Sequence, residues 1–129
     1  MSDDKGSEIS GLGQICITVR DLDRCRGFYR DTLGLKHLFD APGMAFFDLG
    51  GVRLMMGTAE KPELLHPASI LYYRVDDIRA AAQRLKGRGV HVESEPRAVH
   101  KDARHELWLA FFRDPEENLL ALMSEVTVA

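Results

Sequence analysis

Two stretches of the chain follow one plan, and this internal repeat limits the folds that the sequence can adopt. They read "QICITVRDLDRCRGFYRDTLGL" and "SILYYRVDDIRAAAQRLKGRGV". Each holds an alternating strand, a valine, an acidic helix cap, an amphipathic helix and a glycine. Aligning Val19 with Val75 places Asp21 on Asp77. Short strands follow each helix, so we predict two copies of a strand–helix–strand–strand–strand unit.

The elements of the two copies can be placed by their periodicity and turn residues. A strand at about Gly13 to Val19 leads to a helix that Asp21 caps and that Gly34 ends in a left-handed conformation. A long loop through His100 is expected in the second copy. The remaining strands are predicted near residues 36–39, 44–49, 52–57, 90–93, 106–113 and 119–124.

Each copy is predicted to form a four-stranded sheet with one helix on one face, because strand side chains alternate between two faces. The other face of each sheet needs a partner, so the two halves are expected to curl together. This gives an α+β fold of two βαβββ modules that form an open, cleft-containing barrel. The predicted core residues, on the helix side, are Ile15, Ile17, Val19, Val52, Leu54, Met56, Leu71, Tyr73, Val75, Leu120 and Leu122.

The length of 129 residues fits one domain, predicted over residues 12–129, with modules at about 12–57 and 68–125. Residues 1–11 are polar and acidic and read as a disordered leader rather than a signal peptide.

Composition excludes several classes of partner. A net charge of −3 gives no polybasic footprint, so we expect no nucleic-acid partner. No apolar run approaches the roughly 20 residues that span a bilayer, so we expect no membrane partner. The two cysteines, Cys16 and Cys25, do not suggest a disulfide framework and lack Cys-x-x-Cys spacing. We therefore interpret them as reduced thiols. These features favour a cytoplasmic protein.

Four stretches together resemble the glyoxalase/bleomycin-resistance/dioxygenase superfamily, also called vicinal oxygen chelate proteins. They are "ITVRDLDRCRGFYRDTLGL", "DLGGVRLMM", "YYRVDDIRAAAQRLKGRGV" and "AFFRDPEENLLALM". The resemblance covers the chain from about Leu12 to Glu125 and implies the same paired βαβββ modules. In the turn "DPEEN", Glu117 stands where the family usually has glycine, which predicts strain or a different turn.

The resemblance also implies where a divalent metal ion would bind in the enzymes of this family. Its four ligands would fall at Gln14, Met55, Ile70 and Ala121. A divalent ion needs several nitrogen or oxygen donors, and Met, Ile and Ala offer none for a hard ion. We therefore expect no metal cofactor, and we interpret Gln14 as a hydrogen-bonding residue of the cleft. A surface position and a residual metal ligand are its alternatives.

The predicted cleft is mostly apolar and aromatic with a few polar points, as is typical of a pocket for an organic ligand. Arg74 would pair with a ligand carboxylate or phosphate, or alternatively with Asp48 at the rim. The predicted ligand-binding residues are Gln14, Arg53, Met55, Ile70, Tyr72, Arg74, Trp108, Phe111 and Ala121.

The stretch "VHKDARHELW" carries the most reactive side chains, and three interpretations of it stay open. It is a polar surface loop with Trp108 packed in the core or at a dimer contact. Alternatively it closes over the cleft, with Trp108 stacked on a ligand, His105 as a general base and Glu106 as a further catalytic candidate. As a third interpretation, His100 and His105 form a displaced metal site with Gln14 or Glu106.

Three functions follow from these patterns. The first is metal-independent binding of an aromatic or amphipathic small molecule. The second is a lyase, isomerase or dioxygenase with a non-standard site made of Gln14, His100, His105 and Glu106. The third is a domain that mainly pairs with another protein. The resemblance also implies a homodimer.

Overall fold

The chain forms two βαβββ modules, as predicted. The structure, a computed structural model, describes residues 8, 10–59 and 69–128. Most of the predicted leader, 1–11, and most of the connection between the modules lie outside these residues. In the first module the elements are β1 (Gln14–Val19), α1 (Leu22–Gly27), η1 (Phe28–Thr32), β2 (Lys36–Ala41), β3 (Met44–Leu49) and β4 (Val52–Thr58). In the second they are β5 (Leu71–Arg74), α2 (Ile78–Gly87), β6 (Val92–Lys101), β7 (His105–Arg113) and β8 (Leu119–Thr127).

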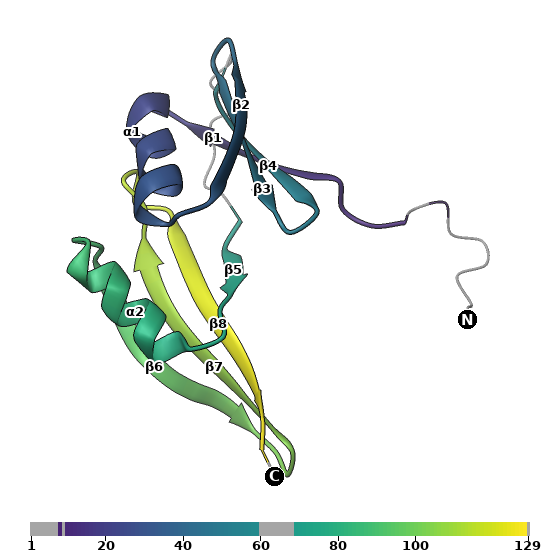
Figure 1. Ribbon diagram of the computed structural model, residues 1–129, viewed down its shortest axis with the longest axis vertical. Helices are drawn as coiled ribbons and strands as arrows, with labels where there is room; N and C mark the ends of the chain where they lie inside the picture. The colour runs from purple at the N-terminus through teal and green to yellow at the C-terminus, as the bar shows by residue number, and fades with distance from the viewer. Residues whose placement is uncertain (1–7, 9, 60–68, 129) are drawn as a thin grey trace.

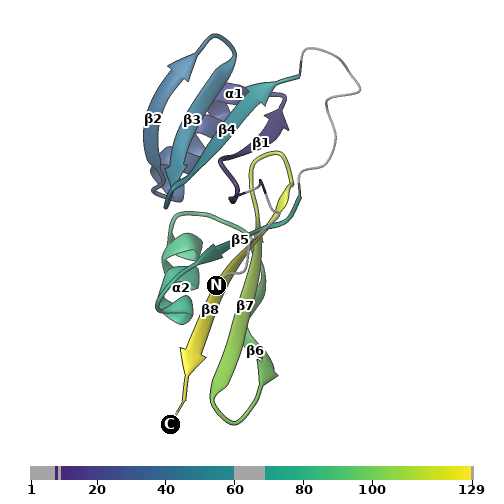
Figure 2. The same ribbon diagram turned by 90° about the vertical axis from the view of Figure 1, so that its right-hand side faces the viewer.

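Each module has its own four-stranded mixed sheet. The strand orders are β1-β4-β3-β2 and β5-β8-β7-β6. In both sheets the first strand pairs in parallel with the last strand of its module, and the other pairs are antiparallel. Figures 1 and 2 show one module above the other, and in Figure 1 α1 and α2 lie on the same side of the two sheets. Each sheet therefore keeps one face free of helix, which we call its open face.

The repeat is visible in the helix caps. Asp21 and Asp77 have nearly the same backbone angles, φ −115° and ψ 90° against φ −118° and ψ 96°. Each side chain accepts a hydrogen bond from the backbone N–H three residues later, at 3.1 Å. Gly34 has φ 76°, so the predicted left-handed end of the first helical segment is confirmed. This segment is not uniform, because its second half, η1, is a π-helix.

The core lies between the sheets and the helices. Six of the predicted core residues are buried there, namely Ile17, Val19, Leu54, Met56, Leu120 and Leu122. Ile15, Leu71, Tyr73 and Val75 are partly buried against the same cluster. Val52 is half-buried and lies outside that cluster. In the described parts of the chain, no helix is long and apolar enough to cross a membrane.

One prediction of local structure is wrong. The long loop expected through His100 is instead strand β6, which extends to Lys101 and pairs with β7. The register of this pair shifts in three places, and Pro96 lies within the strand. Proline is tolerated there because β6 is an edge strand. Bulges and proline break the regular alternation by which a strand is recognised in a sequence.

Candidate functional site

The open face of the first sheet carries a small polar and aromatic group. The Gln14 side-chain oxygen accepts a hydrogen bond from Arg53 Nε at 2.8 Å. The Gln14 amide nitrogen lies 3.7 Å from the sulfur of Met55. The Arg53 guanidinium carbon lies 5.4 Å from the ring centre of Phe46. Gln14, Arg53 and Met55 therefore meet on one face, where the Gln14 side chain is hydrogen-bonded within the chain. Its role as a residue of a ligand cleft stays a prediction.

The open face of the second sheet carries Tyr72, Ala121 and Phe111 side by side on three neighbouring strands. The two aromatic rings meet edge to face, with centroids 6.1 Å apart. Ala121 is fully buried between their strands. Arg74 follows on the same face of β5, since it is two residues from Tyr72. Ile70 is exposed and precedes the first residue of β5.

Trp108 lies on the opposite face of the second sheet from Tyr72, Phe111 and Ala121, the residues with which we grouped it in one cleft. Residues alternate along β7, and Trp108 shares the helix-covered face with the buried residues Ala110 and Phe112. Its indole N–H donates to Glu106 at 2.9 Å, and the guanidinium of Arg79 in α2 lies 4.8 Å from its ring centre. Trp108 packs against the core, which is the structural alternative that we left open. Trp108 and Phe111 are three residues apart in one strand, and this odd spacing predicts that their side chains point to opposite faces.

The two histidines of "VHKDARHELW" lie at the β6–β7 hairpin. His100 Nε2 is 3.6 Å and His105 Nδ1 is 3.9 Å from the Asp102 carboxylate. His105 and Glu106 are neighbours in β7, so their side chains point to opposite faces. Figures 1 and 2 place β1, with Gln14, in the upper module and this hairpin at the lower end. The predicted grouping of Gln14, His100, His105 and Glu106 in one site is therefore wrong.

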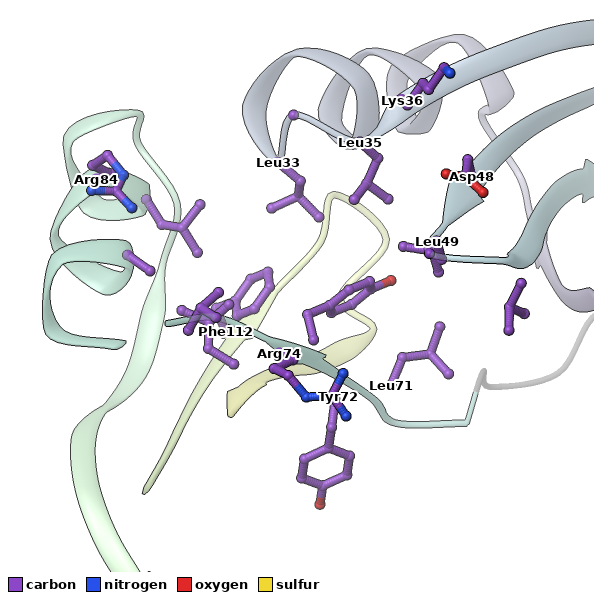
Figure 3. Close-up of a pocket in the computed structure, with 18 of the residues that line it drawn as sticks. Leu33, Leu35, Lys36, Asp48, Leu49, Leu71, Tyr72, Arg74, Arg84 and Phe112 are labelled. Atoms are coloured by element: carbon purple, nitrogen blue, oxygen red, sulfur yellow. The ribbon is translucent and has the colours of Figure 1, made fainter. Parts of the chain in front are cut away.

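A pocket of about 680 Å³ lies between the two modules. Figure 3 shows Leu33, Leu35 and Leu49 of the first module facing Leu71 and Phe112 of the second. The other apolar lining residues are Ile15, Val52, Val75, Ala81, Leu85 and Leu122. The polar lining residues are Lys36, Asp48, Tyr72, Tyr73, Arg74, Arg84 and Arg88.

This pocket is not the cleft that the sequence predicted. Of the residues predicted to bind a ligand, Tyr72 and Arg74 line it, and the others do not. Arg74 forms no ion pair with Asp48, the alternative partner that we considered for it, although both line the pocket. The difference arises because most of the lining residues lie on the helix-covered side of their sheets. There the side chains of each module fill its own core but leave space where the modules meet.

Tyr73 is a candidate functional residue that the sequence placed only in the core. It lines the pocket, and its hydroxyl oxygen is buried without a hydrogen-bond partner among the described residues. Burial, together with the nearby Asp114 carboxylate, raises the pKa of this phenol well above its usual range. The hydroxyl therefore stays protonated at neutral pH and can donate a hydrogen bond. Alternation along β5 correctly indicated its face, but nothing in the sequence showed a pocket there.

Comparison with known proteins assigns the family. The sequence model of the glyoxalase/bleomycin resistance protein/dioxygenase superfamily matches residues 11–122. The chain belongs to this superfamily. YraH of Bacillus subtilis (strain 168), an uncharacterized protein, is 29% identical over 125 residues, which are 86% of this chain and 95% of YraH.

Solved structures share the fold of this chain. TnmS3, an antibiotic binding protein from Streptomyces sp. CB03234, is 25% identical, with a TM-score of 0.75 and coverage of 93% of this chain and 99% of TnmS3. A lactoylglutathione lyase from Agrobacterium tumefaciens is 20% identical, with a TM-score of 0.70 and coverage of 90% and 94%. Of these two structures with the same fold, one is thus named as a binding protein and the other as an enzyme.

The positions at which superfamily enzymes hold a divalent metal ion do not fit one in this chain. At the first position, the Gln14 oxygen already accepts the Arg53 N–H, and the guanidinium cation beside it opposes a second cation. The other three positions hold Met55, Ile70 and Ala121, which lack oxygen or nitrogen donors in their side chains. Among residues 8, 10–59 and 69–128, no group of three or more His, Cys, Asp or Glu side chains is arranged to hold a metal ion.

Proposed function

We propose that this member of the superfamily binds an aromatic or amphipathic small molecule in the pocket between its modules, without a metal ion. The observation that supports the proposal is the pocket itself, with apolar walls from both modules and a few polar groups. A volume of about 680 Å³ lies within the range of roughly 300 to 1,000 Å³ that is usual for small-molecule sites.

The chemistry of the lining favours binding over acid–base catalysis. Among the described residues that line the pocket, Asp48 is the one carboxylate and no histidine is present. Tyr73 holds its proton at neutral pH because burial raises its pKa. TnmS3, which binds an antibiotic, gives a precedent for binding within the same fold. The alternative enzyme, with Gln14, His100, His105 and Glu106, is not supported because those residues do not meet.

Binding can be tested by fluorescence titration with N-phenyl-1-naphthylamine, an uncharged aromatic probe. We expect saturable binding of one probe per chain, unchanged by EDTA. Leu35→Trp should weaken it about tenfold or more by filling the pocket, whereas Leu38→Trp on the exposed side of β2 should leave it unchanged. Leu49→Trp is a second pocket-filling variant, and circular dichroism checks the folding of each. Absence of saturable binding, or its loss with EDTA, would reject the proposal.

The homodimer and the cytoplasmic location stay predictions. Phe39 and Tyr72, on the open faces of the two sheets, are 47% and 48% exposed, and exposed apolar side chains of this size favour an interface. Sedimentation equilibrium tests the homodimer. A mass of twice the chain would support it, and the mass of a single chain would reject it.

A further inference from the structure

The pocket between the modules has a charge opposite to that of the whole chain. The chain carries a net charge of −3. Among the described residues, however, those that line the pocket include four basic ones, Lys36, Arg74, Arg84 and Arg88, and one acid, Asp48. A positive pocket in an acidic protein attracts anions and repels cations.

We infer that the pocket selects an amphipathic ligand whose apolar body carries an anionic group, a carboxylate, phosphate or sulfonate. The inference rests on the proposed function, because it names the class of molecule that the same pocket takes. The apolar walls would hold the body of the ligand, and the arginines at the edge of the pocket would hold its anionic oxygens.

The arginines of the pocket differ from several others in this protein. Arg26, Arg30 and Arg113 each form an ion pair with a carboxylate, at 2.7 to 2.9 Å. Arg74 and Arg84 form no hydrogen bond or ion pair with any other described residue. Figure 3 shows Arg84 at one side of the pocket, on α2, and Arg74 below it on β5, whereas the amine of Lys36 points away. The guanidinium groups of Arg74 and Arg84 therefore keep their full set of donors for a ligand.

Arg88 is held in place across the gap between the modules. It follows α2, and its Nη1 donates a hydrogen bond of 2.7 Å to the backbone oxygen of Thr32 in η1. This bond uses one of the guanidinium's five N–H donors, so the others remain for a ligand. Arg84 lies one helical turn before Arg88, which places the two side chains on the same face of the helix. Both arginines line the pocket.

The Tyr73 hydroxyl completes the set of donors. A buried hydroxyl without a partner is unfavourable, and an oxygen atom of a bound ligand would relieve this cost. The hydroxyl is neutral, so it adds a directed hydrogen bond to the charge of the arginines. Tyr73 and Arg74 are neighbours in β5 and point to opposite faces, so the Tyr73 hydroxyl acts with Arg84 and Arg88 on the helix side, while Arg74 adds charge at the edge of the pocket.

The test compares two probes of similar aromatic structure. They are 1-anilinonaphthalene-8-sulfonate, which is anionic, and uncharged N-phenyl-1-naphthylamine. We expect the anionic probe to bind the wild-type chain more tightly. The double variant Arg74→Gln/Arg84→Gln should weaken the anionic probe by about tenfold to a hundredfold and leave the neutral probe within about twofold. Tyr73→Phe should weaken the anionic probe by a few-fold, at about the strength of one hydrogen bond.

Arg97→Gln is the matched control, because Arg97 is exposed on β6 and does not line the pocket. It removes one positive charge, as each substitution of the double variant does, and we expect it to leave both probes unaffected. Equal binding of the two probes, or an equal loss with Arg97→Gln, would overturn the inference and leave the proposed function standing. Failure of both probes to bind saturably would overturn the proposed function itself. Single variants replace the double variant if circular dichroism shows that it does not fold.

Discussion

Glu116 of the second module accepts a hydrogen bond of 2.7 Å from the backbone N–H of Asp21 in the first module. The same carboxylate also accepts the backbone N–H of Arg20, at 2.8 and 2.9 Å to its two oxygens. In Figures 1 and 2 the β7–β8 loop that carries Glu116 reaches up to the first module. The start of α1 is thus tied to the second module by a charged group that is only 10% exposed.

Glu116→Ala should therefore destabilise the whole chain. Two backbone N–H groups lose a charged acceptor, and hydrogen bonds to charged groups contribute about 1.5–3 kcal/mol each, so we expect a loss of about 2 kcal/mol or more. Urea unfolding followed by circular dichroism measures it. Glu125→Ala removes a carboxylate from an exposed position of β8 and serves as the control. Equal unfolding midpoints for both variants would contradict the role of Glu116.

Removal of the hydroxyl group should lower the free energy of unfolding at Tyr29 but not at Tyr73. The Tyr29 hydroxyl donates to Asp114 at 2.8 Å, and both residues are buried, with 2% and 3% exposure. Tyr29→Phe should cost about 1–3 kcal/mol, because the carboxylate loses a buried donor. Tyr73→Phe should cost nothing or stabilise the chain slightly, because its hydroxyl has no partner. Urea unfolding of both variants checks the difference, and a large loss with Tyr73→Phe would show that its hydroxyl is satisfied.

Glu117→Gly should stabilise the chain. Glu117 has φ 66°, a left-handed conformation, and it is the one non-glycine residue with positive φ in the described residues. This conformation costs a side-chain-bearing residue about 1 kcal/mol and costs glycine much less. The Glu117 backbone oxygen accepts a hydrogen bond from Arg113, which glycine would preserve. We expect a higher melting temperature in calorimetry, whereas Glu117→Ala should give little gain because alanine keeps the same strain.

The two thiols should differ sharply in reactivity. Cys16 is exposed on β1, whereas Cys25 of α1 is buried. Burial, reinforced by the nearby Glu116 carboxylate, raises the pKa of the Cys25 thiol to about 12, so it stays protonated at pH 8. A thiol reagent should label one cysteine in the native chain and two after unfolding in urea. Cys16→Ser should abolish native labelling, and rapid native labelling of this variant would contradict the burial of Cys25.

Local signals in the sequence determined the repeat, the helix caps and most of the core. Asp21 and Asp77 adopt matching cap geometry because a cap depends on a few adjacent residues. The alternation of Ile15 and Ile17 with Gln14 and Cys16 fixes the two faces of β1, because successive side chains in a strand point in opposite directions. For the turn at Glu117 the resemblance left strain or a different turn open, and the φ of 66° is the strained, left-handed conformation. These features need no knowledge of the partner module.

Only the tertiary structure decided where the pocket lies. Leu35 and Tyr73 belong to different modules, and neither residue's local sequence indicates the gap that they share. The run of β6 past Pro96 also depends on its pairing with β7, since an edge strand tolerates proline that a central strand does not. Packing between modules is a long-range property, and it places Arg74 and Arg84 around one pocket although they lie on different elements. Local sequence patterns indicate which face of a strand or helix carries a side chain. They do not indicate which other part of the chain packs against that face.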